Sequence, residues 1–194
     1  MAQGISLLVG LGNPGAEYAE TRHNAGFRFL DALLVGTGVS LKHESRFHGE
    51  VGRFAVAGRD LWLLKPMAFM NHSGESVAKL ARFYKIPPAE ILVVHDDLDI
   101  PPGSARLKVG GGDGGHNGLA DVTEKLGTPD YVRLRLGIGH PGSAAQVVAY
   151  VLKKAPKPEQ SLIDEAIERA RAYLNDIVQG EFQHAMNALH AHPR

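Results

Sequence analysis

The side chains best suited to acid–base chemistry in this chain are a histidine, a carboxylate and an amide near apolar, strand-like runs. Asn13 lies in a turn rich in glycine and proline, His23 follows that turn, and Asp96 lies two residues after the end of the apolar run 91–94. A histidine held in one tautomer by a carboxylate can act as a general base, and neutral amides can hold a carbonyl oxygen. Because the chain has no cysteine and no serine in a G-x-S-x-G motif, the obvious nucleophile is water.

Two further polar clusters have the same character. Asn71 follows the apolar run 61–64, and His116 with Asn117 lies in the segment 110–118, which holds six glycines in nine residues. Ligands of open α/β sheets collect at the carboxyl ends of strands, so we expect these loops to meet in one site. Turn formation explains any single asparagine, but several of them at strand ends favour a catalytic site.

The glycine loops allow an alternative, a nicotinamide-dependent oxidoreductase, because 10–15 and 110–115 both fit G-x-G-x-x-G. That fold needs a helix opening on the third glycine and an acidic residue about 20 positions later. At the first loop the expected helix starts only after His23, and 34–36 holds Leu-Val-Gly instead of an acid. The pattern therefore disfavours a dinucleotide site, although tight NAD binding would restore it.

A metallohydrolase is a second alternative, because several histidines and carboxylates could converge at the strand ends, namely His23, His95, Asp96, Asp97, Asp99, His116 and His140. None of them has a recognised ligand spacing such as H-E-x-x-H on a helix. For a lone histidine a structural or exposed role is commoner than metal binding. We therefore predict no metal and no other cofactor.

Composition limits the partners and the compartment. Lys plus Arg and Asp plus Glu both total 21, so a nucleic acid would have to be held by a local basic patch. The start of the chain does not resemble a signal peptide, and no apolar run approaches membrane-spanning length. The absence of cysteine fits a reducing compartment. We expect a cytoplasmic protein without membrane contact.

Hydrophobic periodicity predicts one α/β domain over residues 1–194, with helices around a largely buried sheet. Strands are expected at 5–11, 91–94, 105–109 and 132–138, with a hairpin of 49–57 and 61–65. Helices are expected at 25–34, 119–126, 144–152 and 161–178, with others after residue 74 and around 182–189. Residues 153–158 are interpreted as a basic hinge.

Five stretches in order, GLGNPG with TRHNAG, FMN-x-SG, HDDLD, GGG-x-GGHNG and GIGHPG, make the chain resemble the bacterial-type peptidyl-tRNA hydrolases from residue 8 to about 189. The resemblance implies a twisted mixed sheet, largely parallel. It implies hydrolysis, without a cofactor, of the ester that joins a peptide to the 3′-terminal adenosine of tRNA. The substrate partner is then peptidyl-tRNA, and we expect a monomer.

The resemblance also implies roles for individual residues. His23 corresponds to the catalytic base and Asp96 to the carboxylate that orients it. Two amides correspond to catalytic groups, Asn13 and Asn117. The residues that correspond to substrate contacts are Asn71, Met70, Tyr18, Phe69 and His116. The cations that correspond to contacts with the tRNA backbone are Arg106, Lys108 and Arg135. Residues from about 139 to 152 resemble a mobile lid over the cleft.

Three positions depart from the family pattern. Asp113 stands where a histidine is expected in the glycine loop, His72 where a leucine is usual, and Asp97 where a glutamate is common. An acidic Asp113 would weaken local attraction for phosphate without touching the presumed base. The rival outside enzymology is a tRNA- or ribosome-binding module that only grips adenosine, and turnover of peptidyl-tRNA separates it from an enzyme.

Overall fold

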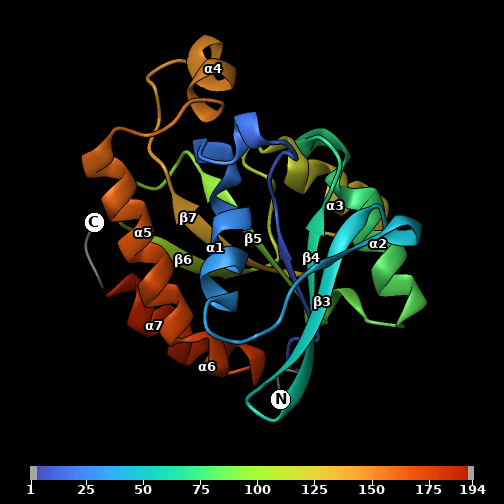
Figure 1. Cartoon of the computed structure of the whole chain (residues 1–194). Coiled ribbons are helices and arrows are strands. Elements are labelled where there is room, and N and C mark those ends of the chain that lie inside the picture. The colour runs from blue at the N-terminus through green and yellow to red at the C-terminus, as the bar shows by residue number, and fades with distance from the viewer. Residues whose placement is uncertain (1–3, 192–194) are drawn as a thin grey trace.

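A computed structural model of the chain describes residues 4–191 and places seven strands in one mixed sheet (Figure 1). The strands lie in the order β2-β3-β4-β1-β5-β7-β6. Their bounds are β1 Leu7–Gly10, β2 Lys42–Glu44, β3 Gly49–Val56, β4 Arg59–Pro66, β5 Ile91–Asp97, β6 Ala105–Val109 and β7 Val132–Gly137. The four central strands, β4, β1, β5 and β7, are parallel, while β2, β3 and β6 pair antiparallel at the two sides.

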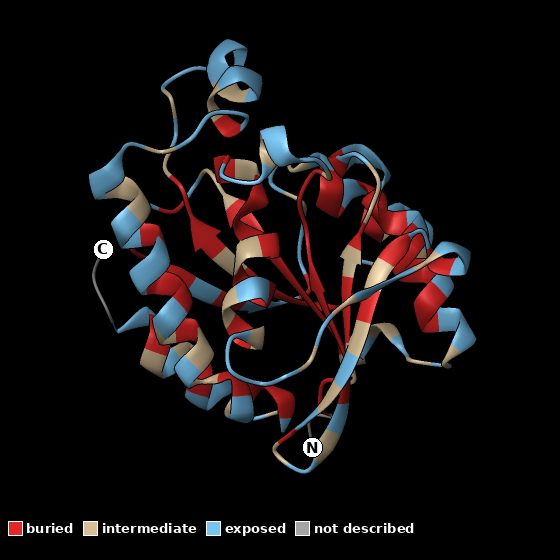
Figure 2. Cartoon of the chain, in the orientation of Figure 1, coloured by how far each residue is buried: buried red, intermediate tan, exposed pale blue. Residues whose placement is uncertain are grey.

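Helices cover both faces of the sheet. On one face lie α1 (Ala25–Leu34), α5 (Lys157–Ala172), α6 (Leu174–Val178) and α7 (Phe182–His190), and on the other α2 (Ser73–Phe83) and α3 (Asn117–Leu126). Leu8 of β1 packs toward the first group, and Leu7 and Val9 pack toward the second. Two-sided burial explains the unbroken apolar run of this strand, and the central strands are buried in Figure 2.

The expected α/β fold with a largely parallel mixed sheet is confirmed, as are the hairpin of β3 with β4 and the bounds of α1 and β6. Strand β5 runs past residue 94 to Asp97, because His95 and Asp96 continue to pair with β7. The expected hinge at 153–158 is wrong at its end, since Pro156 precedes α5 and Pro158 is accommodated in its first turn. The expected helix 161–178 is divided at Tyr173 into α5 and α6.

The parallel strands β1, β4, β5 and β7 end at the same edge of the sheet, and α4 (Val147–Val151) stands beyond that edge (Figure 1). Strand β6 runs the other way, so Val109 lies level with Val132 at the start of β7. The segment 110–115 must therefore return toward the carboxyl edge before α3 begins. Gly110 and Gly111, with φ of 70° and 103°, provide the left-handed backbone at the start of this return.

None of the helices in residues 4–191 is long and apolar enough to cross a membrane.

Candidate active site

A cleft of about 290 Å³ opens at the carboxyl edge of the sheet. Its walls come from the loops after β1, β4 and β5, from the glycine-rich return to α3, and from α4. The predicted site residues that line it are Asn13, Tyr18, His23, Phe69, Met70, Asn71, Asp96, His116 and Asn117. All catalytic and substrate-contacting residues expected from the sequence thus lie around one space, although they come from separate segments of the chain.

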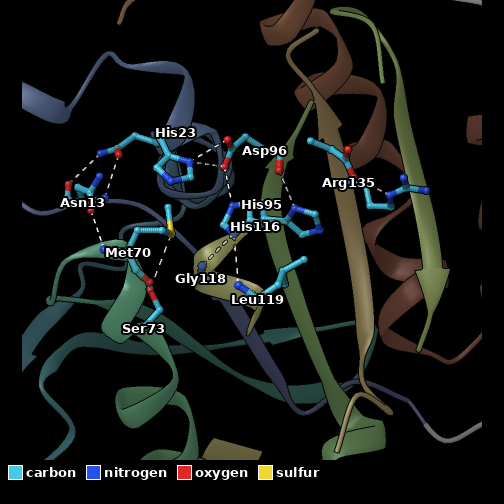
Figure 3. Close-up of polar contacts among 12 residues, drawn as sticks. Asn13, His23, Met70, Ser73, His95, Asp96, His116, Gly118, Leu119 and Arg135 are labelled. Carbon is cyan, nitrogen blue, oxygen red and sulfur yellow. Dashed lines mark hydrogen bonds and ion pairs between the residues drawn. The ribbon is translucent and has the colours of Figure 1, made fainter. Parts of the chain in front are cut away.

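His23 and Asp96 form the central pair of the cleft (Figure 3). His23 lies in a single 3-10 turn, Arg22–Asn24, directly before α1, and Asp96 lies in β5 with 2% of its side chain exposed. The His23 Nδ1 atom is 2.8 Å from Asp96 Oδ2 and 3.0 Å from Oδ1. Since Nδ1 donates to the carboxylate, Nε2 is left as the unprotonated nitrogen of the neutral ring.

The electrostatics of the pair follow from burial and charge. Burial lowers the pKa of His23, but the charge of Asp96 and its hydrogen bond more than offset this, so that the pKa lies above its ordinary value of 6.5. Burial would raise the pKa of the Asp96 carboxyl, yet His23 and His116, through charge and hydrogen bonds, hold it well below its usual range. Asp96 is therefore ionised at any working pH.

His116 makes a second contact with Asp96, with its Nε2 atom 2.9 Å from Oδ1. The other ring nitrogen, Nδ1, accepts the backbone N–H groups of Gly118 and Leu119 at 3.1 and 3.2 Å, so the side chain caps the start of α3. A nitrogen that accepts two amides carries no proton, which places the proton of the neutral ring on Nε2. Both nitrogens are engaged within the protein, and only the ring edge remains for the expected substrate contact.

His23, Asp96 and His116 offer three potential metal-ligand atoms within 4.8 Å of one another. In the arrangement present, however, both imidazoles donate a proton to the carboxylate. To bind a cation through Nε2, His116 would have to lose its proton while Nδ1 still accepts two amides, which would leave an anionic ring. The donor set therefore fits a hydrogen-bonded cluster better than a metal site, in agreement with the absence of a ligand-spacing motif.

Asn13 is oriented by the backbone. Its Oδ1 atom accepts the N–H of Met70 at 2.7 Å, so its Nδ2 amide is the group left to face the cleft. Asn24, which is 1% exposed, fixes the Asn13 backbone from behind by accepting its N–H and donating to its C=O, both at 2.9 Å. The sequence reasoning did not assign Asn24, whose only signal is its place in the polar cluster before α1.

The remaining walls are asymmetric. Asn71 and Asn117 are exposed at the rim, Asn117 as the first residue of α3. Met70 is buried, whereas Phe69 is 58% exposed. The rings of Phe69 and Tyr18 meet edge to face, with their centres 6.2 Å apart. An aromatic pair that lines the cleft beside polar amides can take a flat ring and its polar substituents.

The segment 139–152, expected to be a lid, forms the far wall of the cleft through four apolar residues, Val147, Val148, Val151 and Leu152. Arg22 joins this segment to the 3-10 turn that carries His23: its guanidinium lies 3.7 Å from the centre of the Tyr150 ring and donates to the Tyr150 carbonyl at 2.9 Å. Sequence reasoning missed this role, because nothing in the spacing of Arg22 and Tyr150 indicates contact. The mobility of the segment remains a prediction.

The expected tRNA cations lie on the β6–β7 pair. Arg106 and Lys108 are exposed on β6, and Arg106 stands opposite Arg135 of β7 in the strand register. Arg135 is less free, because its Nε donates to Asp97 at 2.8 Å. Arg133, on the same strand, is 1% exposed and donates to three backbone carbonyls, so that its role is structural.

The other polar residues of the sequence analysis are placed less centrally. His95 is buried, and its Nδ1 donates to the carbonyl of Asp96. His140 and His72 are exposed. Asp113 accepts the N–H of Gly115 at 2.8 Å and so shapes the glycine loop. The first glycine loop does not open a helix, since α1 begins at Ala25 after two 3-10 turns, and the dinucleotide alternative lacks its phosphate-binding helix.

The chain is similar to known proteins over nearly its whole length. A family model described as peptidyl-tRNA hydrolase matches residues 7–194. The chain is 60% identical to the peptidyl-tRNA hydrolase of Aromatoleum aromaticum over 187 residues, which cover 96% of this chain and 94% of that protein. It is 55% identical to the Neisseria gonorrhoeae enzyme over 191 residues, covering 98% and 100%.

A solved structure gives the same result. The crystal structure of peptidyl-tRNA hydrolase from Acinetobacter baumannii superposes with a TM-score of 0.95 at 52% identity, covering 99% of this chain and 97% of that one. Sequence and fold agree over nearly the full length of the chain. The chain belongs to the peptidyl-tRNA hydrolase family.

Proposed function

We propose that this chain hydrolyses the ester between the peptide and the 3′-terminal adenosine of peptidyl-tRNA, with water as the nucleophile and His23 as the general base. The observation that carries the assignment is the pairing of His23 Nδ1 with the buried Asp96 carboxylate at 2.8 Å, which leaves Nε2 as the proton acceptor of a cleft-lining ring. A positioned base of this kind is worth about 10²- to 10⁴-fold in rate.

In the first step a water oxygen forms a bond to the ester carbonyl carbon while its proton moves to His23 Nε2. The carbonyl oxygen becomes an oxyanion, and the resulting imidazolium is stabilised by Asp96. In the second step the bond from this carbon to the 3′-oxygen breaks, and His23 returns its proton to that oxygen. The products are a free peptide carboxylic acid and tRNA with a 3′-hydroxyl group, so the reaction consumes one water and no other reagent.

The Nδ2 group of Asn13 is our candidate donor to the oxyanion. Its oxygen is occupied by the Met70 amide, so the donor cannot turn away without breaking that bond. A fixed neutral donor stabilises developing charge without competing for the proton in transit. Asn117, exposed at the start of α3, is the candidate for holding the attacking water or the ester group.

The rest of the cleft fits the two halves of the substrate. Phe69 and Tyr18 offer ring surface and Asn71 an amide, which suit the terminal adenosine and its ribose. Opposite them, the apolar residues of α4 fit the side chains of the peptide, with residues 139–152 acting as a lid. Arg106, Lys108 and Arg135 extend from the cleft along β6 and β7 and suit the phosphates of the tRNA acceptor stem.

The test uses an N-acetylated aminoacyl-tRNA in water enriched in ¹⁸O, with the protein present at far below the substrate concentration. We expect many turnovers and the label in the acetylated amino acid, because the bond between the carbonyl carbon and the 3′-oxygen is the one that breaks. Binding without turnover would instead identify a tRNA-binding module. Label in the tRNA hydroxyl would contradict attack at the carbonyl carbon.

A further inference from the structure

Both ring nitrogens of His116 form hydrogen bonds with other groups of the protein. Nδ1 accepts two N–H groups at the start of α3, and Nε2 contacts Asp96, as Figure 3 shows. Gly118 makes room for this arrangement, since a Cβ atom there would stand 2.6 Å from the sulfur of Met70 and 2.9 Å from Cε1 of His116. The side chain is only 9% exposed, so the ring is fixed by packing as well as by hydrogen bonds.

The direction of these bonds settles what His116 offers to its neighbour. Because backbone amides can only donate, Nδ1 has to be the acceptor, and the single proton of the neutral ring is then on Nε2. His116 is therefore a donor toward Asp96 and cannot switch to the other tautomer without losing the cap of α3. The ring also links the positive end of this helix to the carboxylate.

We propose that His116 is a positioning residue for hydrolysis, which acts through Asp96 by donating from Nε2 to Oδ1 and thereby directs the carboxylate toward His23. This proposal rests on the proposed roles of His23 and Asp96. Asp96 is almost completely buried, and its carboxylate accepts N–H groups from two neighbouring rings, His23 before α1 and His116 before α3, whose centres are 5.0 Å apart. Without the second donor, the carboxylate would lose one of two partners.

The bond from His116 also moderates the strength of the base. A carboxylate that shares its charge with two donors stabilises the imidazolium of His23 less than one that serves His23 alone. Removing the donor of His116 should therefore raise the pKa of His23 further above its ordinary value and leave less of the base neutral near pH 7.

The other titratable and charged groups around His23, Asp96 and His116 do not replace the effect of His116 on the pKa of His23. His95 lies next to His116, with ring centres 5.1 Å apart, but burial lowers its pKa to about 4, so it stays neutral in the working range. Asp97 is paired with Arg135, and Arg22 is directed to Tyr150. The remaining charged group along the cleft in residues 4–191 is Asp113, whose Oδ1 accepts the Gly115 amide.

Two variants separate this role from simple capping of α3. His116→Asn keeps a strong N-cap acceptor, but its amide nitrogen is too short to take the place of Nε2. His116→Ala removes both functions. We expect His116→Asn to melt near the wild-type temperature, to retain KM within about threefold and to lose roughly 10- to 100-fold in kcat, the range for a hydrogen bond to a charged group.

The decisive readout is a titration of the His23 ring by NMR in the free protein, which needs no turnover and so does not depend on the proposed function. In His116→Asn the His23 pKa should rise, and the acid limb of kcat should move to higher pH with it. An unchanged or lowered His23 pKa overturns the proposal. Wild-type kcat in His116→Asn together with a destabilised His116→Ala would reduce His116 to a helix cap, and a change in KM alone would make it a substrate contact.

Discussion

Replacing Asp96 by asparagine should reverse the tautomer of His23 while leaving the shape of the site intact. The carboxylate accepts N–H groups from two rings, but an asparagine has only one oxygen to offer. The proton on His116 Nε2 is fixed by the cap of α3, so the single oxygen of the introduced amide must face His116. The amide nitrogen then donates to His23 Nδ1, which moves the ring proton to Nε2.

A His23 ring that carries its proton on Nε2 has no lone pair toward the cleft. The variant should therefore lose the whole contribution of the general base, about 10²- to 10⁴-fold in kcat. Steady-state release of an N-acetylated amino acid from tRNA measures this loss, with KM and the melting temperature as controls for binding and folding. Because the carboxylate that raises the His23 pKa is gone while burial remains, the acid limb of residual activity should move to lower pH.

The double variant with His116→Asn gives a sharper check. Once the proton of His116 is removed, the oxygen of the introduced amide in Asp96→Asn can turn to His23 and restore the productive tautomer. We expect the double variant to be faster than Asp96→Asn alone, although each single change slows the enzyme. Losses that multiply, or Asp96→Asn with nearly wild-type kcat, would refute the tautomer reasoning.

The same geometry has consequences for other residues of the cleft and its surroundings. Asn13→Asp keeps the acceptor for its backbone partner but removes the donor, so kcat should fall roughly 10²- to 10³-fold. Arg106→Ala with Lys108→Ala should raise KM and reduce the salt dependence of log KM by about one unit of slope per lost phosphate contact. Arg22→Gln, which loosens α4, should raise KM more than it lowers kcat. In the wild type, kcat/KM should fall below a pKa higher than 6.5, because protonated His23 cannot accept a proton.

Each of these predictions has a matched control or a result that would contradict it. For the cation pair, Lys42→Ala with Arg53→Ala removes the same charge at the opposite edge of the sheet and should leave the salt slope unchanged. If both pairs behave alike, tRNA does not follow β6. For Asn13, wild-type kcat in the aspartate variant would assign the oxyanion to another donor. If Arg22→Gln changes only the melting temperature, the contact between Arg22 and Tyr150 is structural. If kcat/KM falls only below a pKa under 6.5, Asp96 does not raise the pKa of His23.

Local pattern was enough to predict much of the fold. The stripe of α1 and the alternation of β6 gave correct bounds, and the unbroken apolar runs of β1 and β5 identified central strands. The errors lie where tertiary contacts override local signals. Strand β5 continues through two polar residues because β7 pairs with them, and α5 starts at Lys157 because proline is tolerated in a first turn.

The residue types of the site could be predicted from the sequence, but the hydrogen bonds between them could not. Asp96 and His23 stand out because each is a polar residue in a loop or strand end near an apolar strand, and the structure does bring them together in the cleft. Asn24 and Arg22 could not be assigned, since each binds backbone groups, which carry no sequence signal: Asn24 those of Asn13, and Arg22 the carbonyl of Tyr150, 128 residues away. The same holds for His116, whose partner Asp96 is reached only because the glycine loop returns across the sheet.

The most direct test of the central claim is the turnover number of His23→Ala on N-acetylated aminoacyl-tRNA, measured beside its melting temperature. The side chain lies at the wall of an open cleft, so its removal should leave the fold intact. We predict that kcat falls by about 10²- to 10⁴-fold with KM little changed. A folded His23→Ala protein that turns over within tenfold of the wild type would contradict the assignment of His23 as the base.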